Sequence, residues 1–326
     1  MAIPYLIDTD PGIDDALALL LAFRSPECSV EAITTVAGNV GVERCTLNTV
    51  RILEAAGLAR VPPVGRGAEK PLARALVSAP HVHGDDGLGN LADLREPDGS
   101  LRYAKPRLTL SPLDGPDLIL DTIDRFPDDL VVVALGPLTN LAVALQRDAR
   151  RMARLRRVVI MGGAVGVPGN VTPVAEFNFY VDPEAAAQVL ASGLSIELIP
   201  LDVTTRAILR RSLLQERLAA CPDPLSRFVS DVTQRGFQFA EEIGEGGITL
   251  HDPVALGIAL QPSLTHFESL HVAVECEGAL TRGMSVADRR SIPVGKKAPA
   301  TCRVARWLRA DNFLALFLDR VCPASS

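Results

Sequence analysis

Short apolar runs alternate with longer amphipathic segments along most of this 326-residue chain. The clearest apolar run is residues 130–135, Leu-Val-Val-Val-Ala-Leu, and such continuous runs are typical of parallel strands that are covered on both faces. Amphipathic segments with helix start and stop residues lie between these runs. The resulting order of strand, helix, strand, helix predicts a doubly wound, mostly parallel sheet with helices on both faces.

The individual elements follow from the same pattern and from the residues that interrupt it. Strands are predicted at residues 6–7, 31–36, 61–64, 130–135, 156–161, 195–201, 267–275 and 284–294, with an antiparallel pairing left open for the last two. Helices are predicted at residues 14–23 and 41–56, after Gly136-Pro137, from Asp182-Pro183 to Gly193, at 211–242, from His251 onward and at 311–320. Acidic residues or Pro in a first turn, and Gly just after a last turn, support these boundaries.

One segment, residues 66–107, does not fit the alternation. It is rich in Gly, Pro, His and Asp, and it contains His81-Val82-His83-Gly84-Asp85-Asp86-Gly87. A loop of this length is too long for a simple connection, which predicts a functional loop or a lid. No linker, repeat or low-complexity segment divides the chain, so a single domain over residues 1–326 is predicted.

Composition and charge narrow the classes of function. The net charge is −6, aromatic residues make up 4% of the chain and no run of five Lys or Arg residues occurs. These features argue against nucleic acid or an anionic membrane as a partner. The N-terminus has no basic region before an apolar one, and the apolar stretch at 16–23 is far shorter than the roughly 18 residues of a membrane span. We therefore expect a cytoplasmic protein whose six scattered cysteines are buried thiols.

The residues with the most chemical content are four aspartates, Asp8, Asp10, Asp14 and Asp15, directly after the first predicted strand. Four carboxylates this close repel one another unless a cation neutralises them. Hard oxygen ligands suit Ca²⁺ or Mg²⁺ rather than Zn²⁺. Solvated acidic residues at a helix N-terminus are the alternative, and the crowding of four carboxylates favours the metal site.

Two other motifs were compared with this cluster. In a calcium-binding EF-hand loop that starts at Asp8, the fifth and twelfth positions would be Gly12 and Leu19, which cannot serve as side-chain ligands. The phosphotransferases of the haloacid-dehalogenase type have D-x-D-x-[TV] after a strand. Asp8-Thr9-Asp10 fits its first half, but Gly12 replaces the Thr or Val. A Mg²⁺-dependent phosphohydrolase with Asp8 or Asp10 as nucleophile therefore stays as the weaker alternative.

Further polar residues follow the other predicted strands, at the edge of the sheet where such folds bind their ligands. They are Asn39, Asn170, Glu176, Asn178 and Asp202, joined by His251 and Asp252 at the start of a later helix. The glycines at 162–163 lack the spacing of a dinucleotide fingerprint, and neither a nucleophile elbow nor a phosphate-binding loop occurs.

Four blocks of the sequence resemble the inosine-uridine-preferring nucleoside hydrolases. The family signature is similar to Asp8-Thr9-Asp10-Pro11-Gly12-Ile13-Asp14-Asp15-Ala16, and a second block to Leu135-Gly136-Pro137-Leu138-Thr139-Asn140-Leu141-Ala142. A third is similar to residues 161–164 with 169–178, and a fourth to His251-Asp252-Pro253. The resemblance covers essentially the whole chain. It implies cleavage of ribonucleosides, with uridine, inosine and cytidine expected, to ribose and a free base.

The resemblance also implies roles for individual residues. One Ca²⁺ would be bound by the carboxylates of Asp10, Asp15 and Asp252 and by the backbone carbonyl of Leu135. Asp10 would also act as general base, and His251 as the acid that protonates the leaving base. The substrate would lie against Asp14, Asn39, His83, Met161, Asn170, Glu176 and Asn178. A homodimer or homotetramer is expected from the same resemblance.

Purely structural roles are the alternative for several of these residues. Asn170 and Asn178 can be turn residues, and Met161 can fill the core. His83 can be a surface residue of the lid, and His251 can pack at the start of a helix. For the base, Phe237 and Phe239 can stack and Gln238 can read an edge, or the aromatic rings can face the core at helical spacing. A nucleoside- or ribose-binding protein without turnover is a third hypothesis for the whole chain.

Overall fold

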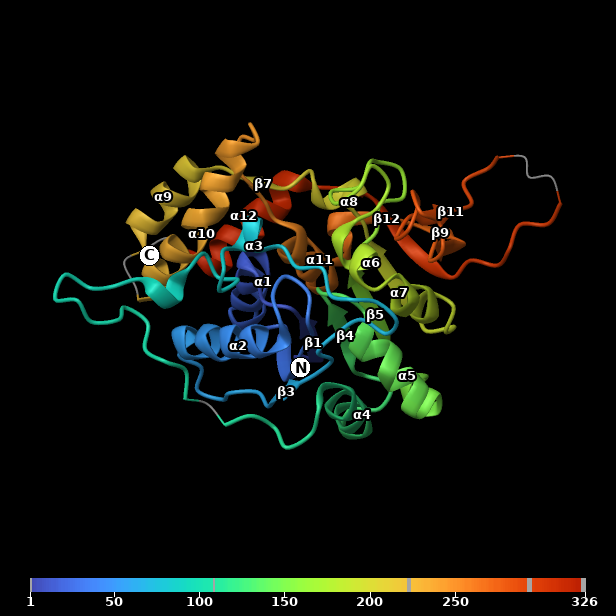
Figure 1. Cartoon of the computed structure of the whole chain (residues 1–326), viewed down its shortest axis with the longest axis horizontal. Helices are drawn as coiled ribbons and strands as arrows, with labels where there is room; N and C mark the ends of the chain where they lie inside the picture. Colours follow the sequence, from blue (N-terminus) through green and yellow to red (C-terminus); the bar gives the residue numbers. More distant parts are fainter. Residues whose placement is uncertain (1, 108, 222–223, 292–294, 324–326) are drawn as a thin grey trace.

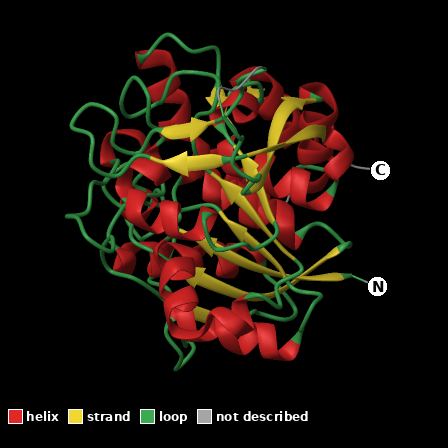
Figure 2. Cartoon of the chain, turned by 90° about the vertical axis from the view of Figure 1, so that its right-hand side faces the viewer, coloured by secondary structure: helices red, strands yellow, loops and turns green. Residues whose placement is uncertain are grey.

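The protein is described here by a computed structural model that covers residues 2–107, 109–221, 224–291 and 295–323. Its centre is an eight-stranded sheet in the order β3-β2-β1-β4-β5-β6-β12-β9 (Figures 1 and 2). Neighbouring strands are parallel, except that β9 runs antiparallel to β12 at one edge. The strands are β1 (Ile3–Thr9), β2 (Cys28–Thr35), β3 (Val64–Arg66), β4 (Val131–Ala134), β5 (Arg157–Met161), β6 (Ile196–Ile199), β9 (Thr265–Leu270) and β12 (Cys302–Leu308).

Helices cover both faces of this sheet, as Figure 2 shows from the side. One face packs against α1 (Ile13–Phe23), α2 (Val42–Ala56), α10 (Pro224–Glu242), α11 (His251–Leu260) and α12 (Ala310–Val321). The other packs against α4 (Gly115–Arg125), α5 (Thr139–Met152) and α7 (Pro183–Leu190). The remaining helices are α3 (Pro80–His83), α6 (Phe177–Val181), α8 (Leu201–Thr204) and α9 (Arg211–Ala220). The predicted doubly wound, mostly parallel α/β fold is confirmed.

Alternation along the central strands explains why the chain needs both layers. In β4, Val131 and Val133 belong to one core, whereas Val132 and Ala134 belong to the other. Successive side chains of a strand point to opposite faces, so a wholly apolar strand must be covered twice. This burial places the strand ends, rather than their faces, in reach of a ligand.

The later part of the chain differs from the sequence prediction. The predicted strand at 267–275 is two strands, β9 and β10 (Val272–Val274), and β10 pairs antiparallel with β11 (Ser285–Ala287). The predicted strand at 284–294 therefore ends early, and its residues 292–294 lie outside the described part. Strand β12 was not predicted, although it completes the main sheet beside β6. Long-range pairing decides such short strands, and local pattern does not record it.

Smaller corrections concern helices. The helical segments predicted over 211–242 are the two helices α9 and α10, whereas α4 was not predicted. Strand β6 ends at Ile199, so Asp202 lies in α8 rather than at a strand end. A second small sheet pairs β7 (Ile208–Leu209) with β8 (Ile248–Thr249), which brings the start of α11 beside α8. Within the described residues, no helix has the length and apolarity needed to cross a membrane.

Candidate active site

The first strand delivers its aspartates through a very tight loop. Strand β1 ends at Thr9 and α1 begins at Ile13, so only Asp10, Pro11 and Gly12 connect them. A Cβ atom on Gly12 would lie 2.5 Å from Nδ1 of His83 and 2.8 Å from Nδ2 of Asn39. Glycine is thus required at this position, because two site residues approach the backbone from outside.

Three carboxylates meet at the end of this loop. Oxygen atoms of Asp14, Asp15 and Asp252 all lie within 4.8 Å of one another, which is close enough to share one metal ion. The first two come from the start of α1 and the third from the start of α11, and these helices pack against each other. Helix packing therefore brings together residues that are more than 230 positions apart in the sequence.

Asp10 lies beside this group and is almost completely buried. Its Oδ2 atom accepts a hydrogen bond of 2.7 Å from the backbone N–H of Asn39, whose side-chain amide donates to Oδ2 of Asp15 at 3.3 Å. A Cβ atom on Gly38 would lie 2.0 Å from Oδ2 of Asp10, so this carboxylate is held against bare backbone. Asn39 therefore joins the two buried carboxylates.

The electrostatics of the cluster are unfavourable without a cation. Burial, and then the charge of Asp15, raise the pKa of Asp10 well above its usual range. Burial also raises the pKa of Asp252, and the charges of Asp14, Asp15 and Asp10 act in the same direction. Among the described residues that line the adjoining cavity, none is Lys or Arg. Oxygen donors without a counter-charge fit a hard divalent cation such as Ca²⁺.

Asp8 has a different environment from the other aspartates. It is fully buried beneath the loop, where its Oδ1 atom accepts hydrogen bonds from Oγ1 of Thr34 at 2.5 Å and Nδ2 of Asn140 at 2.7 Å. Burial raises its pKa to about 7, although the two hydrogen bonds act to lower it. Asp8 is not among the residues that line the cavity. This position does not suit a nucleophile, which must touch the substrate.

Amide and carboxyl groups gather on the other side of the cavity. Nδ2 of Asn178 donates to the backbone carbonyls of Leu135 at 2.6 Å and Met161 at 3.2 Å. The Glu176 carboxylate caps α6 and accepts from the backbone N–H groups of Gly163 and Asn178, each at 2.8 Å. The ends of β4 and β5 are thereby connected to α6, and the Leu135 carbonyl already has one hydrogen-bond donor.

Two histidines border the carboxylates. Nδ1 of His83 accepts a hydrogen bond of 3.1 Å from the backbone N–H of Ile13, and Nδ1 of His251 lies 2.8 Å from Oγ1 of Thr204. Burial lowers the pKa of both rings, to about 4 for His83, while the charges of Asp15 and Asp14 act in the opposite direction. The His83 ring is therefore neutral at neutral pH, and it carries its proton on Nε2 because Nδ1 is an acceptor.

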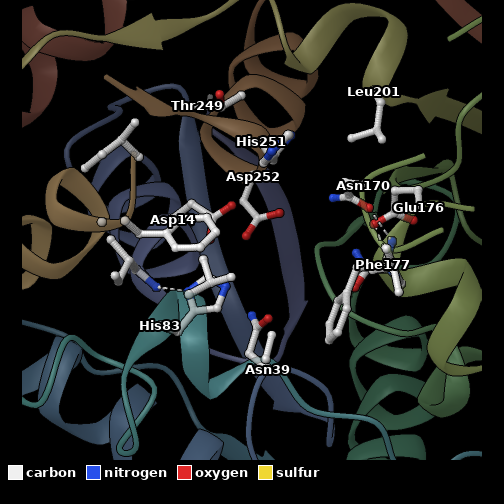
Figure 3. Close-up of a pocket in the computed structure, with 18 of the residues that line it drawn as sticks. Asp14, Asn39, His83, Asn170, Glu176, Phe177, Leu201, Thr249, His251 and Asp252 are labelled. Carbon is white, nitrogen blue, oxygen red and sulfur yellow. Dashed lines mark hydrogen bonds between the residues drawn. The ribbon is translucent and has the colours of Figure 1, made fainter. Parts of the chain in front are cut away.

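A cavity of about 670 Å³ unites these groups (Figure 3). Ten of the residues singled out in the sequence line it, whereas Asp10 and Asp15 are buried and reach it only through hydrogen bonds with the lining residue Asn39. The ten are Asp14, Asn39, His83, Leu135, Met161, Asn170, Glu176, Asn178, His251 and Asp252. The structure brings them together, whereas their individual roles stay predictions.

Other lining residues were missed or misjudged by the sequence reasoning. Phe239 lines the cavity, but Phe237 is buried against Arg211 and Gln238 is exposed outside it. Glu245 and Thr249 also line the cavity, and the sequence analysis did not single them out. Phe237 and Phe239 differ because they lie on opposite faces of α10. Glu245 and Thr249 were missed because their positions depend on β8, a two-residue strand without a sequence signal.

Comparison with known proteins gives consistent matches over the full length. Residues 5–315 match the profile of the family described as inosine-uridine preferring nucleoside hydrolase. The pyrimidine-specific ribonucleoside hydrolase RihA of Salmonella newport (strain SL254) is 39% identical over 325 residues, which are 98% of this chain and 99% of that protein. RihA of Citrobacter koseri (strain ATCC BAA-895) is 40% identical over 323 residues, 98% of each chain.

Solved structures agree with these relatives. A plant nucleoside hydrolase, the PpNRh1 enzyme, superimposes with a TM-score of 0.86 at 32% identity and 99% coverage of both chains. The purine-preferring ribonucleoside hydrolase from Gardnerella vaginalis has a TM-score of 0.88 at 29% identity and 98% coverage of both chains. Fold and site thus define an α/β nucleoside N-ribohydrolase. The chain belongs to the inosine-uridine preferring nucleoside hydrolase family.

Proposed function

We propose that this protein is a calcium-dependent ribonucleoside hydrolase that cleaves uridine, inosine and cytidine to ribose and the free base. The observation that carries the proposal is the buried carboxylate cluster, which adjoins a cavity without any lining Lys or Arg among the described residues. A cavity of about 670 Å³ is of the size that takes a small organic ligand, roughly 300–1,000 Å³. The names of the RihA relatives support uridine and cytidine, and the family description supports inosine.

The metal would be held by Asp15, Asp252 and Asp10, with the Leu135 carbonyl as a further oxygen donor. Asp14 is close enough to the first two to join them, since the three carboxylates lie within 4.8 Å of one another. Calcium, when bound there, would supply the positive charge that keeps these carboxylates ionised and that acidifies a nearby water molecule. Asn39 holds two of the carboxylates in place through its backbone and side-chain N–H groups.

The chain's own residues then divide the reaction between them. Asp10 would remove a proton from the attacking water, whose oxygen forms the new bond to C1′ of the ribose. The bond from C1′ to the base nitrogen breaks, and its electron pair leaves with the base through an oxocarbenium-like transition state. His251 would donate an N–H to the departing base. Asn178, Asn170 and Glu176 would orient the ribose from the opposite side of the cavity.

Two alternatives are less well supported. A phosphohydrolase needs positive charge for its phosphate, and the described cavity lining contains no Lys or Arg. Asp8 is buried away from the cavity as well. A binding protein without turnover would be expected to lack one of Asp10, Asp15, Asp252 or His251, and all four are present. Hydrolysis is therefore the function that the site favours.

A panel of nucleosides with and without excess chelator tests the proposal. We expect ribose release from uridine, cytidine or inosine that is lost in chelator and restored by Ca²⁺. Asp252→Asn should abolish the calcium response, whereas Asp121→Asn, an exposed position on α4, should keep it. Full activity in excess chelator would contradict the metal role. Release of phosphate from phosphomonoesters, without ribose release, would favour the phosphohydrolase instead.

A homo-oligomer and a cytoplasmic setting, with nucleoside catabolism or salvage as the physiological role, complete the proposal. Light scattering coupled to size exclusion would give the mass in solution. A mass of one chain would exclude the dimer and the tetramer.

A further inference from the structure

The cavity has two chemically different sides around the carboxylates. Figure 3 shows Asn170, Glu176 and Phe177 to the right of Asp252, and Thr249 and His251 above it. The first side offers amide and carboxyl groups, which suit the hydroxyl groups of a sugar. In the proposed function, the ribose also lies beside the carboxylate cluster in the centre. If the proposed function holds, the base must therefore extend toward Thr249 and His251.

The wall on this base side is mostly apolar. Phe239, Ile243 and Ile248 line it, and the Phe239 ring meets His81 edge-on with 6.1 Å between centroids. The nearby cation of α10, Arg235, does not line the cavity, since it donates to the backbone carbonyl of His81 and to Glu242, each at 2.7 Å. Apolar contacts hold the flat face of a base but cannot distinguish one base edge from another.

Besides His81 and His251, this wall has the polar residues Glu245 and Thr249, which both line the cavity. Glu245 is exposed to solvent, and Oγ1 of Thr249 donates to its Oε2 atom at 3.4 Å. The backbone N–H of Glu245 is fixed on the carbonyl of Ala240 at 2.8 Å, at the end of α10. Because the Thr249 hydroxyl hydrogen is directed at Glu245, the pair offers lone pairs and no N–H or O–H donor to the cavity.

We propose that Glu245, supported by Thr249, reads the edge of the base and favours bases that carry an amino group over those with a carbonyl in its place. An amino group donates hydrogen bonds to the carboxylate, whereas a carbonyl oxygen at the same position faces negative charge. Cytidine is then a better substrate than uridine, and adenosine a better one than inosine. Each pair has nearly equal size, so the apolar wall does not separate its members. The inference rests on the proposed function and refines its substrate class.

The test compares kcat/KM for cytidine and uridine in the wild-type protein and in Glu245→Gln. Glutamine keeps an acceptor oxygen and adds an N–H donor that can meet the uridine carbonyl. We expect the wild type to favour cytidine and the ratio to fall roughly fivefold to tenfold in the variant, as for one solvent-accessible hydrogen bond to a charged group. Comparing ratios removes the intrinsic difference between the two leaving bases.

Glu241→Gln is the matched control, because it removes the same charge nearby while Glu241 pairs with Arg211 outside the cavity. Its ratio should equal that of the wild type. An unchanged ratio in Glu245→Gln would overturn the inference while ribose release upholds the proposed function. Absence of ribose release from every nucleoside would instead overturn both.

Discussion

The Nδ1 atom of His83 accepts a hydrogen bond from the backbone N–H of Ile13 at 3.1 Å. This contact joins His83, the last residue of α3, to the first residue of α1, directly beside the aspartates. It uses one of the unpaired N–H groups at the start of a helix, and it fixes the proton of the neutral ring on Nε2. The ring is thus a hydrogen-bond donor of defined orientation at the edge of the cavity.

His83→Ala should therefore damage both stability and turnover. We expect a loss of about 1 kcal/mol in the free energy of unfolding, from the unpaired N–H group of Ile13. We also expect kcat/KM to fall at least about tenfold, since one positioned polar contact to the substrate is lost. Denaturant unfolding and ribose release measure the two effects. The exposed His266 on β9 provides the control His266→Ala, and equal behaviour of both variants would refute the role of His83.

Asp10→Asn should separate activity from stability. Turnover should fall by at least about 100-fold, the lower end of the range for a lost general base. In chelator, however, the variant should be at least as stable as the wild type, because one buried and repelled carboxyl group is removed. Ribose release and urea unfolding test the two parts. Near-normal kcat would show that Asp10 is not the base.

His251→Ala should depend on the leaving group. If His251 assists the departing base, natural nucleosides should lose about 100-fold in kcat, and a nitrophenyl riboside less than about tenfold. A nitrophenolate needs no proton at neutral pH, whereas the nitrogen of a nucleobase does. Steady-state kinetics with both substrates decide the point. Equal losses would argue for a structural role of the ring, for example through its contact with Thr204.

Glu176 should give the protein a stability that decreases between pH 4.5 and 7. Burial raises its pKa from 4.5 to about 7 in the folded protein, so the folded state keeps a proton that the unfolded state has already lost. By linkage, the free energy of unfolding falls as the pH rises through this window. The full effect of this one group is about 3 kcal/mol.

Glu176→Gln is the test of that prediction. Urea unfolding at pH 4.5 and pH 7.5, in chelator and without nucleoside, gives the pH dependence of each protein. The wild type should lose up to about 3 kcal/mol more than the variant over this range. Parallel profiles would mean that the Glu176 carboxylate is ionised throughout, stabilised by the three backbone N–H groups that it accepts.

Much of the site was predictable, because it lies in continuous blocks. Asp10, Asp14 and Asp15 are consecutive or nearly so, and Glu176 with Asn178 begins a single short helix. Local sequence also indicated His251-Asp252 as a helix start. The distinction between Phe237 and Phe239 was not predictable, since neighbouring positions of α10 face the core or the cavity according to how the helix packs.

By itself the sequence determined the α/β alternation, the two buried faces of the sheet and the crowding of aspartates after β1. These are properties of adjacent residues, and they need no knowledge of distant segments. The family resemblance had already grouped Asp252 with Asp15, but only the tertiary structure decided that Asp14 lies with them, that β12 completes the sheet, and that Glu245 reaches the cavity. The physical reason is that burial against distant elements, rather than local pattern, fixes how helices pack and how short strands pair.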